Sequence, residues 1–229
     1  MGSTSNSVAI PLRHQFVRRF IQLQIGLVCY GLSMALMIQA RLGLDPWDVF
    51  HQGIARRTGL RFGLVVIATG VLVLLLWIPL RQRPGIGTIS NVIVIGLAVD
   101  AALLVLPAPD PLAARWAFLI GGIVLNGIAT GLYIGARLGP GPRDGLMTGY
   151  VARTGGSIRL VRTTIEVTVL VVGWLLGGTV GWATLLYAVA IGPLAHVFIP
   201  LFSVRAPAVE TDVRMITLSF GRYDTQNSG

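Results

Sequence analysis

Two aspartates and four arginines recur at fixed positions in two copies of one short motif. The motif reads A-R-L-G-x-x-P-x-D-x4-G-x3-R-T-G, and the copies are 96 residues apart. Carboxylates and guanidinium groups in such a pattern either bind charged groups of a small solute or stabilise helix ends and anchor at the membrane interface. We take as candidates for substrate binding the recurring residues Asp48, Asp144, Arg41, Arg137, Arg57 and Arg153.

Glu166 is a further candidate for substrate binding. It is the one charged residue in the 40-residue stretch 163–202. A carboxylate within a membrane is costly and usually faces the protein interior. Arg162 precedes it by four residues on the same helix face, so the two form either a structural ion pair or part of a solute site. The matching position in the other half is Gly70, so this carboxylate is not duplicated.

Other polar residues within the apolar runs are expected to have structural roles. Asp100 and His196 occupy matching positions at the ends of two runs, where we expect hydrated groups at the interface. His51 has no counterpart, because position 147 is Met, and Asn91 and Asn126 are suited to hydrogen bonds between helices.

The composition indicates a membrane protein. Of 229 residues, 54% are hydrophobic and only 12% are charged, against about 25% in ordinary globular domains. The net charge of +9 comes from arginines that lie between apolar runs, which is typical of membrane-flanking charges and argues against nucleic-acid binding. A single cysteine, Cys29, excludes a Cys-based metal site, and no H-E-x-x-H or G-x-x-x-x-G-K motif is present. We therefore expect no enzyme, no metal site and no cofactor.

Six apolar runs are long enough to cross a bilayer of about 30 Å. They are Phe20–Ala40, Phe62–Leu80, Ile86–Leu106, Trp116–Ala136, Arg159–Leu176 and Trp182–Phe202. The last two come from one long stretch, which Gly177–Gly181 divides. The sequence thus predicts an all-α polytopic membrane protein with six transmembrane helices.

A duplication organises these runs. Ten of the 20 residues 40–59 are identical to those 96 positions later, where chance would give about one or two. Each copy of the motif predicts a helix of about 13 residues, with Pro46 or Pro142 in the first turn and Gly59 or Gly155 as its cap. At about 20 Å this helix is too short to span the bilayer.

Two architectures remain open. If the short helices are re-entrant or interfacial, each half has three spans and the two repeats are inverted; if they cross, the repeats are parallel. Arginine counts do not decide, because either topology places 13 of 18 on the inside. The length of the short helices favours the inverted arrangement, with both termini in the cytoplasm. The expected segments are 1–19, a cytoplasmic head; 20–109, the first repeat; 110–203, the second repeat; and 204–229, a polar cytoplasmic tail.

The chain also resembles a known family. The patterns L-G-L-D-P-W-D-V, R-T-G and G-I-G-T-I-S-N, with L-G-P-G-P-R-D-G-L-M and L-L-G-G-T-V-G-W-A-T in the second half, are similar to the YczE/YitT-type bacterial integral membrane proteins. The resemblance covers about residues 20–203. It implies a multi-pass protein of the bacterial plasma membrane and provides no catalytic residues.

We expect a permease-like transporter of an unidentified small solute, with a site where the two repeats meet. The arginine excess favours an anionic or zwitterionic solute. The alternative is a non-transporting accessory or regulatory protein that binds a partner within the membrane. In either case the surrounding medium is the lipid bilayer, and a homo-oligomer is compatible with the sequence.

Overall fold

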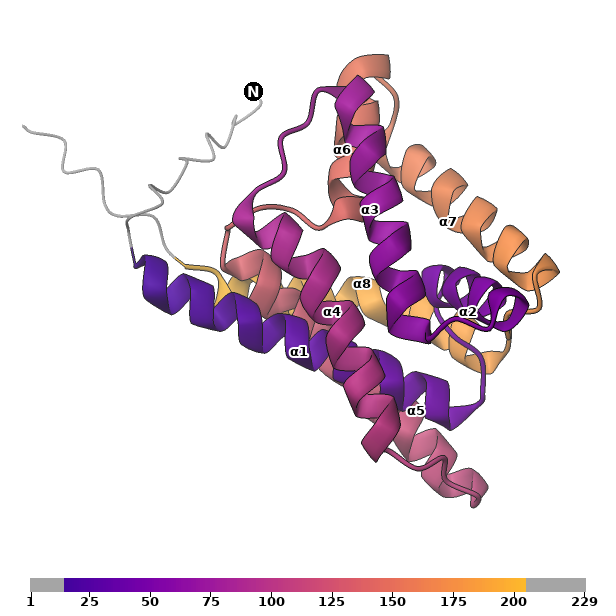
Figure 1. The fold of residues 1–229 in the computed structure, drawn as a ribbon. Coiled ribbons are helices and arrows are strands. Elements are labelled where there is room, and N and C mark those ends of the chain that lie inside the picture. The colour runs from indigo at the N-terminus through magenta and orange to yellow at the C-terminus, as the bar shows by residue number, and fades with distance from the viewer. Residues whose placement is uncertain (1–14, 205–229) are drawn as a thin grey trace, which may run out of the picture. The chain divides into compact units, whose positions relative to one another are not determined.

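The structure, a computed structural model, describes residues 15–204. Within this range it is entirely helical, with eight helices and no strand. The helices are α1 (Phe16–Ala40), α2 (Pro46–Thr58), α3 (Phe62–Leu80), α4 (Ile86–Val105), α5 (Leu112–Gly135), α6 (Pro142–Thr154), α7 (Ile158–Leu175) and α8 (Trp182–Phe202) (Figure 1). The first helix begins inside the predicted head segment, whereas residues 1–14 and 205–229, which hold the rest of the predicted head and nearly all of the predicted tail, lie outside the described range.

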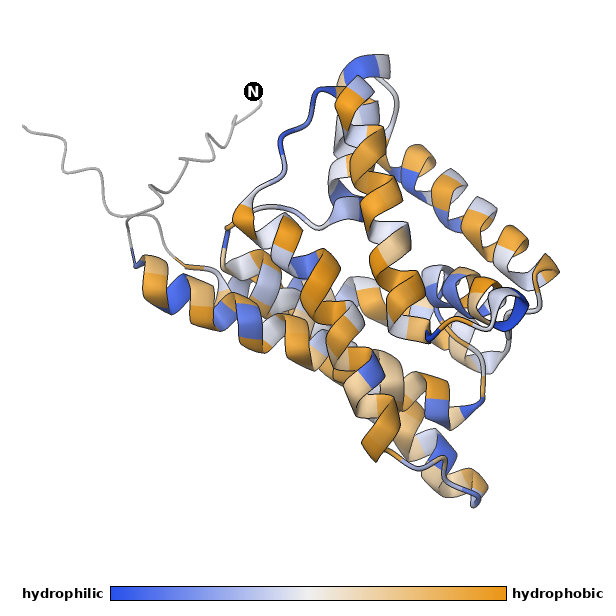
Figure 2. Cartoon of the chain, in the orientation of Figure 1, coloured by the Kyte–Doolittle hydropathy of each residue, from blue (hydrophilic) through white to orange (hydrophobic). Residues whose placement is uncertain are grey.

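The expectation of an all-helical membrane protein is confirmed, and five helices are long and apolar enough to span a bilayer. These are α1, α3, α4, α5 and α8. The sixth predicted span, α7, has 18 residues but carries Arg159, Arg162 and Glu166. Figure 2 shows that most of the length of these helices consists of hydrophobic residues, and on α8 Leu185, Val189 and Val197 are each more than 60% exposed. Such faces are suited to contact with lipid.

The short helices α2 and α6 begin and end as the motif predicts. Asp45 caps α2, because its Oδ1 accepts hydrogen bonds from the backbone N–H groups of Trp47 (3.0 Å) and Asp48 (3.2 Å). The equivalent cap of α6 is Gly141, which has no side chain to do this. Both helices are 13 residues long and end at a glycine with positive φ, which only glycine adopts without strain.

Two arginines 96 residues apart make the same contacts with opposite halves of the chain. The Arg19 guanidinium, on α1, donates to the carbonyl oxygens of Ala136 (2.8 Å) and Arg137 (2.7 Å) at the end of α5. The Arg115 guanidinium, on α5, donates to those of Ala40 (2.8 Å) and Arg41 (2.6 Å) at the end of α1. These bonds satisfy carbonyls that a helix end leaves without partners. Each long helix therefore closes the end of the other.

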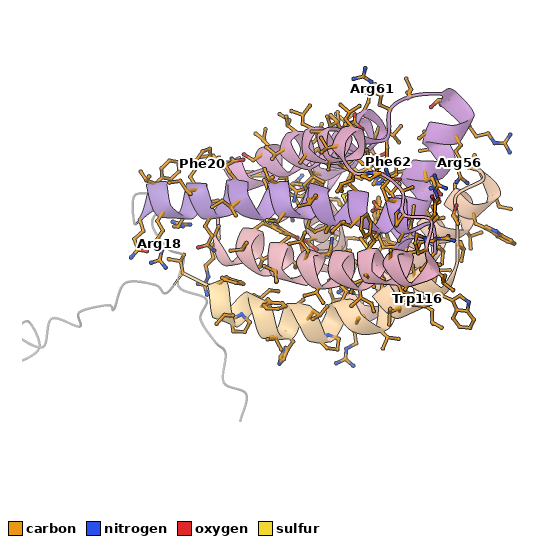
Figure 3. All side chains as sticks on the ribbon, turned by 90° about the horizontal axis from the view of Figure 1, so that it is seen from below. Arg18, Phe20, Arg56, Arg61, Phe62 and Trp116 are labelled. Carbon is orange, nitrogen blue, oxygen red and sulfur yellow. The ribbon has the colours of Figure 1, made fainter. Side chains whose placement is uncertain are left out.

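The same contacts require α1 and α5 to run in opposite directions. In Figure 3, Phe20 near the start of α1 and Trp116 near the start of α5 lie at opposite ends of this helix pair. Gly26 on α1 and Gly122 on α5, also 96 residues apart, allow the two helices to pack closely, because a Cβ at either would clash with the facing helix.

The connections that follow α1 and α5 repeat one hydrogen-bond pattern across the two halves. The N–H of Gly87 donates to the carbonyl of Leu138 (2.9 Å), and the N–H of Ala183 donates to that of Leu42 (3.0 Å). Gly43 and Gly139 have φ of 109° and 132°, and both lie against the start of a helix from the other half. Helix α2 accordingly packs on α7, and α3 packs on α6, so each short helix contacts a long helix of the other half. The labels in Figure 1 show these four helices close together.

Candidate functional site

A cavity of about 390 Å³ lies where the two halves meet. Both short helices begin at its wall, since Pro46 and Pro142, their first residues, line it. Helix N-termini carry partial positive charge and free N–H groups, so two of them aimed at one cavity favour a polar or charged ligand. The ionisable residues with acidic, basic or imidazole side chains in the lining are Asp45, His51, Arg143, Asp144, Arg162 and Glu166.

Most of the lining consists of positions that match across the 96-residue offset. Nine such pairs face the cavity: 45 with 141, 46 with 142, 47 with 143, 51 with 147, 66 with 162, 70 with 166, 91 with 187, 92 with 188 and 95 with 191. Only the proline and isoleucine pairs are identical; the other seven differ. The two halves therefore contribute equivalent walls that carry different side chains.

Asp45, Asp48 and His51 form a buried cluster at the start of α2. All three are at most 5% exposed, and Asp48 Oδ1 lies 3.2 Å from His51 Nδ1. These groups lie outside the long apolar helices. Burial and the adjacent Asp48 charge raise the pKa of Asp45 to about 8, and burial raises the pKa of Asp48 as well. Burial lowers the pKa of His51 to about 3, so its imidazole is neutral.

Arg143 is one of the two arginines that line the cavity. It is the second residue of α6, and its Cζ lies 4.6 Å from the centroid of the Trp47 ring. The acidic side chains of Asp45 and Asp48 act on it electrostatically, yet no described residue forms a hydrogen bond or salt bridge with its guanidinium. A guanidinium held by an aromatic ring, with its N–H groups uncommitted, is suited to bind a carboxylate or phosphate.

Two carboxylates also line the cavity, Asp144 directly after Arg143 on α6 and Glu166 on α7, and each has one partner. The Tyr133 hydroxyl donates to Asp144 Oδ2 (2.9 Å), and Arg162 Nε donates to Glu166 Oε1 (2.9 Å). The Arg162 and Glu166 side chains are 54% and 36% exposed, so their ion pair is only partly enclosed by the protein. Each carboxylate retains acceptor capacity for a donor group of a ligand.

The predicted substrate-binding residues divide into two groups. Asp144 and Glu166 line the cavity, and Asp48 lies directly behind its wall. The four motif arginines do not line it: all are exposed, and they occupy helix ends, with Arg41 and Arg137 at positive φ after α1 and α5. Of the other polar residues, Asp100 accepts from the N–H of Gly63 (2.6 Å), and Asn126 bonds to Ser33 and Tyr187.

Sequence reasoning missed Arg143, Trp47, Asp45 and the cavity tyrosines, and it judged His51 structural although His51 lines the cavity. The usable signal was divergence within the repeat. Positions 45, 47 and 51 lie within the shared motif but differ in residue type from the matching positions 141, 143 and 147, and position 70, beyond the motif, differs from 166. Residues that diverge inside an otherwise repeated motif mark the asymmetric surface. Across the described residues, no group of three His, Cys, Asp or Glu side chains is placed to hold a metal ion.

Comparison with known proteins places the chain among uncharacterised proteins. A family model described as "Family of unknown function (DUF6198)" matches residues 17–200. An uncharacterized protein of Haemophilus influenzae is 39% identical over 181 residues, which are 79% of this chain and 83% of that protein. The uncharacterized membrane protein YczE of Bacillus subtilis is 32% identical over 191 residues, 82% of this chain and 89% of that protein. The resemblance to the YczE type is thus confirmed; no solved structure matches.

Proposed function

Starting from a chain that belongs to a membrane-protein family of unknown function (DUF6198), we propose that it is a permease-like transporter. It resides in the bacterial plasma membrane with both termini in the cytoplasm, and its solute site is the cavity between the two halves. The single observation that carries this proposal is the set of nine matched pairs that line the cavity. Transporters built from internal repeats bind their substrates at the repeat interface, next to the N-termini of short helices.

The proposed architecture is a pair of inverted repeats. The opposite directions of α1 and α5, and the reciprocal bonds of Arg19 and Arg115, support it. Helices α2 and α6 are re-entrant, because about 20 Å of helix does not cross a bilayer. Helix α7 is the sixth span: at about 27 Å it is almost long enough, and Arg162 and Glu166 face the cavity rather than lipid.

The solute is a small molecule with an anionic group, either an anion or a zwitterion. Arg143 and the two helix N-termini bind the anionic group. Asp144 and Glu166 bind a cationic or hydrogen-donating group at the other end of the solute. The presence of carboxylates in the same lining favours the zwitterion, because a plain anion would leave them without a partner for their free oxygens.

Accessibility of the cavity from each side of the membrane tests the transport function. Met147→Cys, a cavity position, is placed in a Cys29→Ala background and treated with a membrane-impermeant maleimide in right-side-out and in inverted vesicles. Alternating access predicts labelling from both sides. Leu185→Cys on the outer face of α8 is the matched control that stays unlabelled, since lipid covers it.

Labelling of Met147→Cys from one side alone, or from neither, contradicts transport. It would favour the competing function, an accessory protein that binds a partner within the membrane. The cavity lining itself argues for the transporter, since a purely structural centre has no need of six ionisable side chains of acidic, basic or imidazole type around 390 Å³ of space.

A further inference from the structure

One buried carboxylate oxygen beside the cavity has no hydrogen-bond donor. Asp48 is fully buried, and its Oδ2 receives no hydrogen bond from any described residue. The other oxygen, Oδ1, lies 3.2 Å from His51 Nδ1. Burying an ionised carboxylate oxygen without a hydrogen-bond donor is unfavourable. Either the folded state carries this cost in free energy, or a proton on the carboxyl group neutralises the charge and removes the cost.

Asp45 provides the second half of a proton site. The Asp45 and Asp48 carboxyl groups interact through their side chains, and both are buried. Two neighbouring ionised carboxylates repel each other, whereas one proton shared between them removes the repulsion and supplies a hydrogen-bond donor. The two carboxyl groups therefore titrate as one unit.

We propose that Asp45 and Asp48 together hold one exchangeable proton and that this proton is the coupling ion of the transporter. The coupling half of this inference rests on the proposed function, whereas proton binding by the pair does not depend on transport. The motivating observations are the donorless Oδ2 of Asp48, the adjacent Asp45 and the contact with His51.

His51 connects the pair to the cavity, which it lines while its Nδ1 faces Asp48. A hydronium ion in the cavity gives its proton to Nε2 of the neutral imidazole, leaving water. The Nδ1 proton then passes to Asp48 Oδ1. The imidazole is neutral again, now protonated on Nε2, and the carboxyl pair has gained one proton. The reverse sequence releases the proton to the cavity.

Arg143 links solute binding to proton binding. Its positive charge lowers the pKa of both aspartates, against the effect of burial. When the anionic group of a solute binds to Arg143, part of that charge is neutralised, and the pair binds its proton more tightly. By linkage, the bound proton strengthens solute binding to the same extent. The predicted mode is symport of solute and proton.

The other charged or titratable groups near the pair come from α1, α6, α7 and α8. Tyr30 of α1 and Tyr187 of α8 line the cavity next to the pair, and neither is an acidic or basic residue. Glu166 and Arg162 of α7 compensate each other's charge, and Asp144 of α6 is bound by a tyrosine hydroxyl. Helix α3, which also packs on α2, carries no titratable side chain. Arg143 is thus the uncompensated charge that tunes the pair.

Infrared difference spectroscopy of the full chain in lipid tests proton binding directly. Spectra are compared between alkaline and acidic buffer, with and without carboxyl-labelled ¹³C-aspartate. We expect the C=O band of a protonated aspartic acid, which shifts with the label, disappears in Asp48→Asn and persists in Asp144→Asn. Arg143→Gln should move the midpoint of this band to higher pH, because it removes the charge that opposes protonation.

The labelled wild-type protein keeps the test valid even if Asp48→Asn fails to fold. Absence of a labelled band at every pH in the wild-type protein overturns the proposal, and so does a band that survives Asp48→Asn combined with Asp45→Asn. A proton band together with one-sided labelling of Met147→Cys retains the proton site but rejects coupling and transport. Two-sided labelling without the band rejects the proton site alone and leaves transport standing.

Discussion

Arg143 lies over the ring of Trp47, and these two residues occupy the same position in the two copies of the motif. Its Cζ is 4.6 Å from the ring centroid. The contact joins the starts of α2 and α6 at the cavity that both residues line. At these matching positions one half of the chain supplies a guanidinium and the other its aromatic support.

Arg143 is expected to dominate ligand affinity. A panel of amino acids and small carboxylates is screened by thermal shift, and the affinity of any ligand found is compared among variants. Arg143→Gln should cost about 1.5–3 kcal/mol, which is roughly tenfold to hundredfold in Kd, and Arg143→Lys should recover only part of it. Arg153→Gln, at an exposed helix end, is the control. Equal affinities for Arg143→Gln and the wild-type protein would remove Arg143 from the site.

The reciprocal helix closures should contribute to stability. Arg19 is 1% exposed, and its guanidinium serves two carbonyls at the end of α5, so Arg19→Gln should lower the free energy of unfolding by about 2 kcal/mol. Arg115→Gln, at a half-buried position, should cost about 1 kcal/mol. Thermal melts in detergent measure both, and Arg153→Gln should change stability by less than about 0.5 kcal/mol. If Arg153→Gln destabilised the protein as much as Arg19→Gln does, the hydrogen bonds between the arginine side chains and the helix ends would have no specific role in stability.

Helix α7 packs on α2 through Gly173, where a Cβ would meet the backbone of Phe50. We expect Gly173→Ala to cost about 1–3 kcal/mol, because backbone cannot move aside as a side-chain end can. Gly121→Ala on α5 is the matched control, since nothing lies within 4 Å of a Cβ there. That variant should melt at or slightly above the wild-type temperature. Equal melting temperatures for Gly173→Ala and Gly121→Ala would contradict the prediction.

Stability should fall as pH rises in the range where the aspartate pair titrates. The pKa of Asp45 is raised from 3.8 to about 8 in the folded state. Its contribution to stability is therefore complete below 3.8 and is lost as pH rises through about 8. His51, whose pKa is lowered from 6.5 to about 3, has the opposite effect, which is lost as pH falls below 6.5.

Between pH 6.5 and about 8, the ionisation of Asp45 should therefore change the free energy of unfolding without a contribution from His51. The unfolding free energy should decrease there by at most about 1.4 kcal/mol per pH unit. Asp45→Asn keeps the carbonyl oxygen that caps α2 and should flatten this slope. Melting curves across the range provide the measurement, and a wild-type stability that rises with pH would contradict the prediction.

Inverted repeats predict opposite sidedness for matching loops. Arg61→Cys and Ser157→Cys, each in a Cys29→Ala background, lie in matching exposed loops 96 residues apart. An impermeant maleimide should label one of the two cysteines in intact cells, from the outside. It should label the other in inverted vesicles, from the cytoplasmic side. Labelling of both from the same side would instead support parallel repeats.

The periodic features of the sequence predicted most of the helices. The helix bounds Pro46–Thr58 and Pro142–Thr154 agree with the motif, because a proline at the start and a glycine after the end are local signals. Of the six apolar runs predicted to cross the membrane, five correspond to helices that are long and apolar enough to do so. The sixth run, α7, differs because it carries three charged residues, of which Arg162 and Glu166 line the cavity and Arg159 is exposed.

The candidate site was only partly predictable. Asp144 and Glu166 were recognised because a carboxylate in an apolar setting is conspicuous in any sequence. The motif arginines were equally conspicuous, yet Arg41 and Arg137 lie at exposed helix ends, where their carbonyls accept from Arg115 and Arg19. The closure of α1 and α5 thus uses the backbone of these two residues and not their guanidinium groups.

The sequence by itself determined most of the helices and the membrane character, since these depend on composition and on local start and stop signals along the chain. Only the tertiary structure decided which of the residues in the two halves meet. Asp45, Trp47 and Arg143 come together because α2 and α6, from opposite halves, begin at one cavity. That meeting depends on the antiparallel packing of α1 against α5, a relation between distant segments that no local pattern encodes.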